Sequence, residues 1–565
     1  MTPPSQPRPN QLLYPQLDPA PAREAATVLL LRDSNDGADG FEVLMTRRAD
    51  QGIFANAYVF PGGGLEAQDA DPSNHALARV RSSMVEVGGD KRITQALAGI
   101  RETFEELGIL LAYDETGQPV APAQVQQLDR HTSLYEQCRE RGWTLAVDQL
   151  WYLANWTAPF DLPKRFNVPF FVARTPDGQT PVADETEQFE PTWIRPQDAV
   201  QRFEEKNLFI LFPTLSTLKR ISALPDTHAL INTLQSEKPL WQASPRGGHL
   251  QGKDTRHTET DMAYGELEMV LPDGHGIHHL DWQNEKAVPL RKNLMRLTAP
   301  NPGMMSGPGT NTYLVGDASS GYIVIDPGPN ESVHLQRIHE ATGGDIRFIV
   351  CTHSHPDHSP GAAPLQALVE QSSQGKPPIM GMASAPTARA HSRFKPDVSL
   401  RDGEHITLTG QGPDGDITHT LQAIFTPGHA ANHLCFLLQE DALLFSGDHI
   451  LNGSTTVISP PDGNMIDYLA SLDKLHALCL ERDIRYILPA HGYVLGFARH
   501  QITKLKAHRL AREAKVHDAM RSKPDGSIQD WVAIVYADTP PALWPVAQQS
   551  LLAHVERIQK LCLGR

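Results

Sequence analysis

Three histidines and one aspartate lie within a stretch of six residues, where their side chains could share a metal ion. They are His353, His355, Asp357 and His358, and they lie in a loop that contains Pro and Gly and follows a short apolar run. Imidazole and carboxylate groups are ligands for zinc and other borderline divalent ions. A loop at a strand end can aim several side chains at one point, whereas a helix would spread them. The spacing therefore predicts a loop-borne metal site.

A second group of candidate ligands is acidic and lies earlier in the chain. Glu102, Glu105 and Glu106 have the spacing i, i+3, i+4 within a helical pattern, which places three carboxylates on one helix face. Such like charges repel one another unless cations compensate them, and Mg²⁺ takes oxygen ligands and bridges to substrate phosphates. Because Glu-rich helix faces are also common as solvated surfaces, the upstream residues must decide between these two interpretations.

The upstream residues favour the metal site. Residues 58–64 form a predicted strand that ends in a glycine turn, and the helical segment 100–109 follows after an interval. The two segments resemble the Nudix box, in which a glycine turn precedes a helix of the form R-E-x-x-E-E-x-G. The resemblance covers roughly residues 24–225. Within Nudix hydrolases, this segment is most similar to the coenzyme A diphosphatase subgroup. The matching residues are Gly63, Arg101, Glu102, Glu105, Glu106, Gly108 and Ile109.

Two features depart from the usual Nudix box. About two dozen extra residues, near 71–92, lengthen the interval, and Asp69 stands where a glutamate is usual. The resemblance implies that the three glutamates bind Mg²⁺ or Mn²⁺, that Arg101 acts in catalysis by orienting them, and that a metal-activated water cleaves a phosphoanhydride. The general base is either a box glutamate, with Glu105 as the catalytic candidate, or a residue of the acidic loop 184–187.

Further histidine and aspartate residues follow short apolar runs later in the chain. The segments 426–429, 446–448 and 489–492 each place one such residue at a predicted strand end. Together with the H-x-H-x-D-H motif they resemble the metallo-β-lactamase-fold hydrolases, whose ligands lie on one edge of an αββα sandwich. The resemblance implies one metal held by His353, His355 and His429, a second held by Asp357, His358 and His491, and Asp448 between them.

By the same resemblance the two ions are zinc, with Mn or Fe as alternatives, and lie about 3.5–4 Å apart, where they activate a water. Asp357 counts as a catalytic residue as well as a ligand. Aspartate at position 448 favours the glyoxalase- and nuclease-type members over the common drug-hydrolysing lactamases. His433 and His449 lie close by in sequence, and they either orient the ligands or face solvent.

The chain of 565 residues is too long for one core and predicts an α/β multidomain protein. In a linker at 226–290 we expect a strand at 267–271 and surface positions for His275, His278 and His279. The last segment resembles the winged-helix tail of a lactamase-like subgroup and either packs on the hydrolase or binds nucleic acid. We predict a flexible tail at 1–22, a Nudix α/β/α sandwich at 23–225, the linker, a metallo-β-lactamase αββα sandwich at 291–498 and the winged-helix-like tail at 499–565.

Composition narrows the class of protein. No apolar run approaches the roughly 20 residues needed to cross a bilayer, and we expect a cytoplasmic protein because the N-terminus has neither a secretory nor a transit pattern. The five cysteines are odd in number and never paired as CxxC, so we expect reduced core residues. A net charge of −16 argues against broad binding of nucleic acid and leaves small anionic substrates as the favoured partners over RNA.

These patterns predict a bifunctional metal-dependent hydrolase. The Nudix site would cleave a nucleoside diphosphate-linked phosphoanhydride, and the binuclear site would hydrolyse an ester, thioester or phosphodiester. Acyl-coenzyme A offers both a pyrophosphate and a thioester and would explain the fusion. The alternatives are an RNA-processing endoribonuclease with a Nudix accessory domain and a chain in which one domain is a degenerate ligand-binding regulator.

Overall fold

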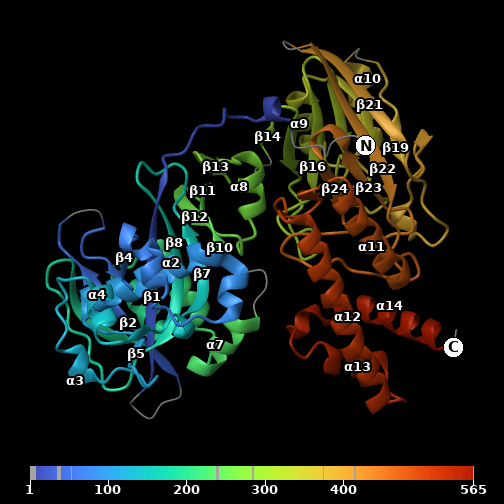
Figure 1. The fold of residues 1–565 in the computed structure, drawn as a ribbon. Coiled ribbons are helices and arrows are strands. Elements are labelled where there is room, and N and C mark those ends of the chain that lie inside the picture. The colour runs from blue at the N-terminus through green and yellow to red at the C-terminus, as the bar shows by residue number, and fades with distance from the viewer. Residues whose placement is uncertain are drawn as a thin grey trace. The chain divides into compact units, whose positions relative to one another are not determined.

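The computed structural model describes residues 8–34, 40–51, 54–236, 241–282, 285–372, 375–412 and 415–563. It divides the chain into two compact units, shown in Figure 1. Asp18–Pro245 forms the first, here called the N-unit, and Met1–Leu17 together with Arg246–Arg565 forms the second, here called the C-unit. Among the described residues, each helix is too short or too polar to cross a bilayer.

The N-unit is built on one mixed sheet that helices cover on both faces. Its strand order is β10-β7-β8-β1-β2-β3, with β4 paired to β1 and β9 paired to β2. The long strand β1 alternates its side chains between the faces: Val28 and Leu30 join the core under α2, and Leu29 and Leu31 join the core under α5 to α7. This period of two, with apolar residues on both faces, predicts a strand buried on both sides.

The strands of the N-unit are β1 (Ala22–Asp33), β2 (Phe41–Arg48), β3 (Tyr58–Val59), β4 (Gly62–Gly64), β5 (Ala112–Tyr113), β6 (Thr144–Leu145), β7 (Trp151–Thr157), β8 (Arg165–Arg174), β9 (Gln188–Ile194) and β10 (Gln242–Ala243). Its helices are α1 (Pro72–His75), α2 (Ser82–Leu107), α3 (Pro122–Val125), α4 (Leu134–Glu140), α5 (Pro196–Glu204), α6 (Phe212–Ile221) and α7 (Thr227–Ser236). The extra residues 71–92 thus supply α1 and the first turns of α2, which is interrupted at Gly89, where φ is 52°.

The C-unit contains a four-layered αββα sandwich. One sheet has the order β14 to β20 and the other the order β21 to β25. A core with Leu290, Tyr313 and Ile325 from the first sheet and Phe436 and Phe445 from the second fills the space between them. Separate cores join the outer face of the first sheet to α9 and α10, and that of the second to α11 and the start of α12. The predicted αββα architecture is confirmed.

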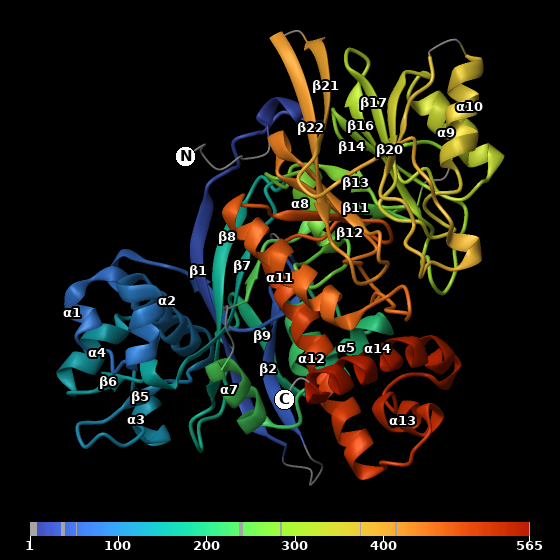
Figure 2. The same ribbon diagram turned by 90° about the vertical axis from the view of Figure 1, so that its right-hand side faces the viewer.

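The sandwich strands are β14 (Val288–Arg291), β15 (Leu294–Thr298), β16 (Asn311–Asp317), β17 (Gly321–Ile325), β18 (Ile346–Val350), β19 (Ile379–Gly381), β20 (Val398–Ser399), β21 (His405–Gly412), β22 (Gly415–Phe425), β23 (Leu434–Leu438), β24 (Leu443–Gly447) and β25 (Tyr486–Pro489). The helices are α9 (Ser332–Ala341), α10 (Ala362–Gln371), α11 (Met465–Glu481), α12 (Ala498–Ser522), α13 (Ile528–Val535) and α14 (Trp544–Leu563). Figure 2 shows α12, α13 and α14 grouped at the C-terminal end of the chain, where they share a small core of their own.

The connecting segment differs from its prediction as a linker. From residue 246 it forms β11 (Arg246–Leu250), β12 (Lys253–His257), α8 (Tyr264–Val270) and β13 (Ile277–His279), all within the C-unit. The strand expected at 267–271 is wrong, because those residues lie mostly in α8, where Glu266 is buried against Arg296. His278 is also buried, 3.4 Å from Glu266, so its predicted surface position is wrong.

The predicted flexible tail is wrong for residues 8–17. Arg8 forms an ion pair of 2.7 Å with the buried carboxylate of Asp441, and the carbonyl of Gln11 accepts a hydrogen bond from the Lys292 amide. A short 3₁₀ turn at Pro9–Gln11 and the packing of Leu13 against the sandwich core complete the docking. Residues 1–7 lie outside the described residues.

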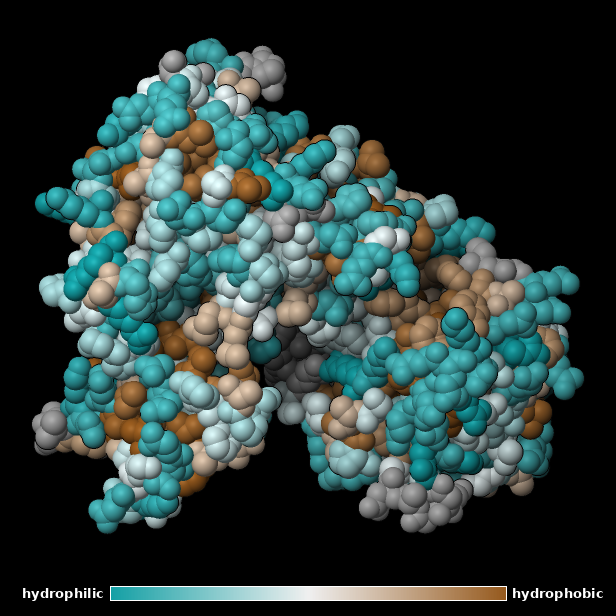
Figure 3. Space-filling model, turned by 180° about the vertical axis from the view of Figure 1, so that it is seen from behind, coloured by the Kyte–Doolittle hydropathy of each residue, from teal (hydrophilic) through white to brown (hydrophobic). Residues whose placement is uncertain are grey.

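Side chains of opposite character are distributed unevenly over the surface. Figure 3 shows mostly hydrophilic side chains on the visible face of each unit, with hydrophobic ones gathered in separate patches.

Four of the five cysteines are buried and Cys562 is exposed, and none forms a disulfide. All but Cys562 are therefore core residues, as predicted.

Candidate metal centres

The structure brings all seven histidine and aspartate candidates of the C-unit together at one edge of the sandwich. Strands β18, β22, β24 and β25 end just before the segments that carry them, so the loops after these strands aim the side chains at one region. Two groups result, in each of which one ligand atom per residue lies within 4.8 Å of the others. The tetrad is His353, His355, His429 and Asp448, and the triad is Asp357, His358 and His491.

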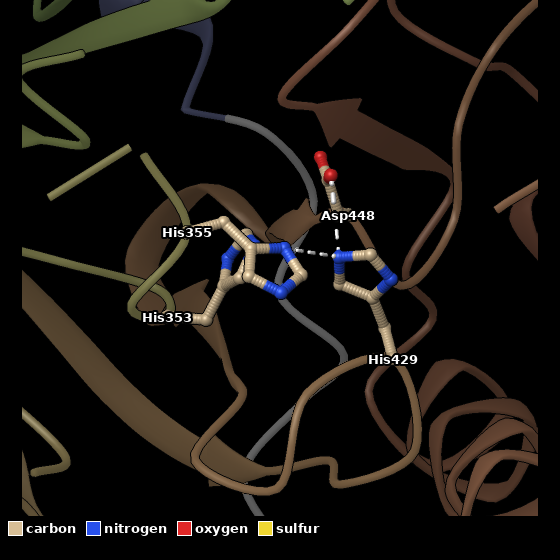
Figure 4. Close-up of side chains that lie close together, drawn as sticks. All are labelled: His353, His355, His429 and Asp448. Carbon is tan, nitrogen blue, oxygen red and sulfur yellow. Dashed lines mark hydrogen bonds and ion pairs between the residues drawn. The ribbon is translucent and has the colours of Figure 1, made fainter. Parts of the chain in front are cut away.

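Figure 4 shows the tetrad, in which His355 and His429 point toward each other and toward Asp448. His429 Nε2 lies 3.0 Å from His355 Nδ1 and 3.4 Å from Asp448 Oδ2. The other carboxylate oxygen of Asp448 lies 3.2 Å from His491 Nε2. Asp448 therefore lies between the tetrad and the triad, as expected of a carboxylate shared by two ions.

Each of three histidines uses one ring nitrogen for a protein partner and leaves the other for the cluster. Nδ1 of His358 donates to Asp326 at 2.9 Å, Nδ1 of His429 to the Val457 carbonyl at 2.7 Å, and Nδ1 of His491 to the Gly309 carbonyl at 3.1 Å. Such hydrogen bonds fix the tautomer in which Nε2 carries a lone pair. The arrangement therefore directs Nε2 of each ring, the nitrogen that a metal would bind, toward the cluster.

Unpartnered polar atoms test whether this cluster fits a metal. Nε2 of His353, Nε2 of His358, Nε2 of His491 and Oδ1 of Asp448 are buried and have no hydrogen-bond partner among the described residues. Buried polar atoms are otherwise almost always paired, since leaving one unpaired costs about 1–3 kcal/mol. Four such atoms converging with carboxylates fit two divalent cations.

The electrostatics of the cluster agree with this donor set. Burial, together with the neighbouring imidazoles of His358 and His355, holds the pKa of His353 well below its ordinary value. Burial alone would raise the pKa of Asp448, but the charges of His491 and His358 hold it well below its usual range. Although burial opposes it, Asp357 and Asp448 raise the pKa of His358, and Asp448 raises that of His491, so a bound cation would displace the protons of these two rings.

Two histidines whose roles were open by sequence are both buried. His433 accepts a hydrogen bond from the backbone amide of Asp448 at 3.2 Å and pairs with the Thr426 hydroxyl at 2.9 Å. It therefore orients the ligand segment and does not face solvent. His449 is also fully buried, and its carbonyl accepts a hydrogen bond from the Tyr468 hydroxyl at 2.8 Å.

The acidic group of the N-unit is organised by a buried arginine. Arg101 is 1% exposed, and its guanidinium donates to Glu102 at 2.9 Å and to Glu105 at 2.8 Å. Its other nitrogens bind both oxygens of Asp69, at 2.9 and 3.0 Å. Asp69 is itself fully buried and accepts from the Tyr135 hydroxyl at 2.6 Å. Asp69 thus holds Arg101 in place and is not free to bind a cation.

The glycine turn lies directly against the helix that carries the glutamates. The Gly62 amide donates to Glu106 at 2.9 Å, and a Cβ on Gly63 would come within 2.4 Å of the Glu102 carboxylate. A side chain at position 63 would therefore displace a candidate ligand. Burial, with a smaller contribution from neighbouring carboxylates, raises the pKa of Glu102 to about 7 and that of Glu106 to about 8.

The three glutamates are less tightly clustered than the ligands of the C-unit. Among the described residues, they do not form a group whose ligand atoms all lie within 4.8 Å of one another. In the acidic loop, Asp184 accepts hydrogen bonds from the Thr186 hydroxyl and from the Gln188 amide, the latter at 2.9 Å, whereas Glu187 is exposed and its charge acts on Glu102 and Glu106. Glu187 is thus the loop residue placed to act with the glutamates.

Several residues that support the sites were missed by the sequence reasoning. Asp326 holds His358 and also accepts from the Thr352 amide at 2.7 Å. Its position after the apolar run 323–325 was a usable signal, because a buried carboxylate at a strand end needs a partner. The Val457 carbonyl could not be found in this way, since any residue type offers the same acceptor.

Comparison with known proteins shows which families the C-unit matches. The model of the metallo-beta-lactamase superfamily matches residues 306–491, and that of the beta-lactamase-associated winged helix domain matches residues 527–561. The beta-lactamase-like protein 2 homolog of Caenorhabditis elegans is 31% identical over 270 residues, which are 47% of this chain and 83% of that protein. The thioesterase pkgB of Emericella nidulans is 33% identical over 227 residues, 40% of this chain and 58% of that protein.

One solved structure with partial similarity to the chain is a Nudix hydrolase. A NUDIX hydrolase from Alicyclobacillus acidocaldarius is 26% identical, covers 39% of this chain and 97% of that protein, and has a TM-score of 0.34. The chain spans less than two thirds of the length of pkgB.

Proposed function

The chain belongs to the metallo-β-lactamase superfamily, and on that premise we propose that its C-unit is a binuclear hydrolase of esters, thioesters or phosphodiesters. The observation that carries the proposal is the set of four unpartnered buried atoms described above, on His353, His358, His491 and Asp448. The tetrad would hold one divalent cation and the triad a second, with Asp448 shared. Zinc is the favoured ion, and manganese or iron are the alternatives.

The chain's own residues supply orientation and charge in this proposal. When bound, two divalent cations lower the pKa of a water and polarise the bond to be cleaved. His353, His355 and His429 hold one side of the site, and Asp357 keeps its carboxylate 3.3 Å from His491 Nε2 on the other. Burial of nearly all these groups excludes bulk water and strengthens their electrostatic action.

For the N-unit we propose a second hydrolytic site that cleaves a phosphoanhydride with Mg²⁺ or Mn²⁺. The support is the buried Arg101 that holds Glu102 and Glu105 beside the glycine turn. Glu102, Glu105 and Glu106 would bind the cation, and Glu105 or Glu187 would serve as general base. The raised pKa of Glu106, about 8, is what a compensating cation would offset.

Acyl-coenzyme A is the substrate that would join the two activities. It carries a thioester for the C-unit and a pyrophosphate for the N-unit, and the name of the relative pkgB supports the thioester. The test is incubation of the full chain with acetyl-coenzyme A and Zn²⁺ or Mg²⁺, followed by assays for free thiol and for 4′-phosphopantetheine products. We expect His353→Ala to abolish thiol release alone and Glu105→Gln to abolish pyrophosphate cleavage alone.

The absence of both products from the unaltered protein would refute acyl-coenzyme A as the substrate. Cleavage of a single-stranded RNA that His353→Ala abolishes and Glu105→Gln retains would instead establish the C-unit as a ribonuclease. Each variant serves as the control for the other, because the two substitutions lie in different units.

A further inference from the structure

A cavity of about 840 Å³ lies in the C-unit, away from the metal ligands. Its lining includes the start of β25, the end of β14 and the first turn of α12. His491 follows the opposite end of β25, five residues after Tyr486, a separation of about 16 Å along an extended chain. The volume lies within the range of about 300–1,000 Å³ that is typical of small-molecule sites.

One buried arginine lines the cavity and has no acceptor for its guanidinium in the described part of the chain. Arg291 is 3% exposed, and among the described residues its side chain takes part in no hydrogen bond or ion pair. The buried carboxylate of Asp441, whose charge acts on Arg291, is already bound by Arg8 at 2.7 Å and by Asn293 at 2.8 Å. A buried cation without a partner is expensive, so a ligand anion would supply what the fold does not.

The first turn of α12 offers a second group of donors to the same cavity. Phe497 at the N-cap has positive φ and provides no side-chain cap, so the amides of Arg499 and His500 have no acceptor within the helix. The positive end of a 25-residue helix favours anions there. The side chain of Arg499 is exposed and adds a positive charge.

The other charged residues of the lining are one paired arginine, two histidines and one aspartate. Arg485 is paired with Glu268. His476 and His500 add groups that are cationic only when protonated, and Asp483 is the acidic member of the lining. The unpaired charges of the lining are therefore those of Arg291 and Arg499 against that of Asp483, and their sum is positive, although the whole chain carries a net charge of −16. Apolar residues, Pro9, Leu12, Pro272 and Phe497, line the rest.

We propose that this cavity binds a small organic oxyanion, whose phosphate or carboxylate is held by Arg291 and the first turn of α12 and whose apolar part lies against Leu12 and Phe497. The site is separate from the metal cluster and does not depend on the hydrolytic function. Residues 8–17, which begin the chain's described part, form one of its walls.

The probes are phenylphosphonate, which cannot be hydrolysed as an ester, and benzoate, with chloride at equal ionic strength as the reference. In calorimetric titration we expect saturable binding of at least one probe to the full chain. Charge-assisted hydrogen bonds are worth about 1.5–3 kcal/mol, so Arg291→Met and Arg499→Met should each weaken binding about tenfold or more. Arg499 is exposed, so its variant should fold even if Arg291→Met does not.

Arg521→Met, at the exposed far end of α12, is the matched control and should bind like the unaltered chain. His353→Ala should also keep the binding, because it alters only the metal cluster. Tighter binding of phenylphosphonate would identify a phosphate ligand, and tighter binding of benzoate a carboxylate ligand. No saturable binding of either probe, binding that both arginine variants retain, or binding that His353→Ala abolishes would overturn the proposal.

Discussion

Arg509, on α12, donates a hydrogen bond to the backbone carbonyl of Thr456, in the loop that follows Asp448. The hydroxyl of Thr456 donates in turn to the Asp448 carbonyl at 2.8 Å. The next residue, Val457, holds His429, and the amide of Ile458 donates to Ser550 on α14 at 3.3 Å. The helical tail therefore supports the loop that orients two members of the tetrad.

Replacing Arg509 with Met should weaken metal binding at the tetrad. Loss of a residue that orients a ligand costs about 10–100-fold in metal affinity, and the Thr456 carbonyl would be left without its donor. Competition with a chromophoric chelator gives the zinc affinity, and the visible spectrum of the cobalt-loaded protein reports ligand geometry. Arg521→Met is the control on the same helix. An unchanged affinity and cobalt spectrum would contradict the positioning role, even if the protein were less stable.

Removal of metal should lower the melting temperature of the C-unit. A ligand that binds only the folded state at 1,000 times its dissociation constant adds about 4 kcal/mol to stability, and the unpartnered buried atoms lose their compensation without it. Calorimetry of the chain with and without a chelator measures the shift. His353→Ala should reduce the shift and Glu105→Gln should not, whereas a melting temperature insensitive to chelation would count against a bound metal.

Replacing Asp69 with Ala should destabilise the N-unit by about 3–5 kcal/mol, because it leaves the buried guanidinium of Arg101 without its main partner. Urea unfolding followed by tryptophan fluorescence measures the effect. Glu105→Gln removes a carboxylate from a more exposed ion pair with the same arginine. It should lower the free energy of unfolding far less. Equal losses for the two variants would show that Asp69 has no special role in holding Arg101.

The C-unit should lose stability on mild acidification through His334. Burial lowers the pKa of this imidazole to about 4, against about 6.5 in an unfolded chain. Because the folded pKa is depressed, the contribution is complete above pH 6.5 and is lost as the pH falls toward 4, by up to about 3 kcal/mol. His334→Gln can keep a hydrogen bond to Thr312, which lies 3.0 Å from the ring.

Melting temperatures of the unaltered chain and of His334→Gln, compared between pH 7 and pH 4.5, measure the contribution. The difference between the two proteins should grow in favour of the variant as the pH falls. A constant difference across this range would mean that His334 does not titrate with folding.

The seven C-unit ligands could be predicted because each lies in a short motif just after an apolar strand. Strand ends such as Val350 and Phe425 are set by local sequence, and the sandwich brings those ends to one edge. The partners of Asp326 and Arg509, which are His358 and the Thr456 carbonyl, could not be predicted from local sequence, because packing between distant segments brings them together.

Two local predictions failed for the same physical reason. The segment 8–17 looks unstructured because it is polar and Pro-rich, yet Arg8 is held by Asp441, 433 positions away. The segment 267–271, apolar apart from Glu268, is predicted as a strand, yet it lies mostly in α8, where Arg296 pairs with Glu266 and Arg485 with Glu268. In both cases a long-range ion pair decides what local composition leaves open.

The docking of residues 8–17 on the C-unit makes the N-unit an insertion within its neighbour's sequence. The chain passes into the N-unit at Asp18 and returns at Arg246, so the N-unit is tethered at both ends. One proteolytic cut between the units would therefore leave two fragments that the contact between Arg8 and Asp441 still joins. A C-unit expressed from residue 246 alone would lack this segment and leave a buried carboxylate unpaired. A shortened protein in which a flexible linker joins residue 17 to residue 246 would keep the C-unit together with its N-terminal segment.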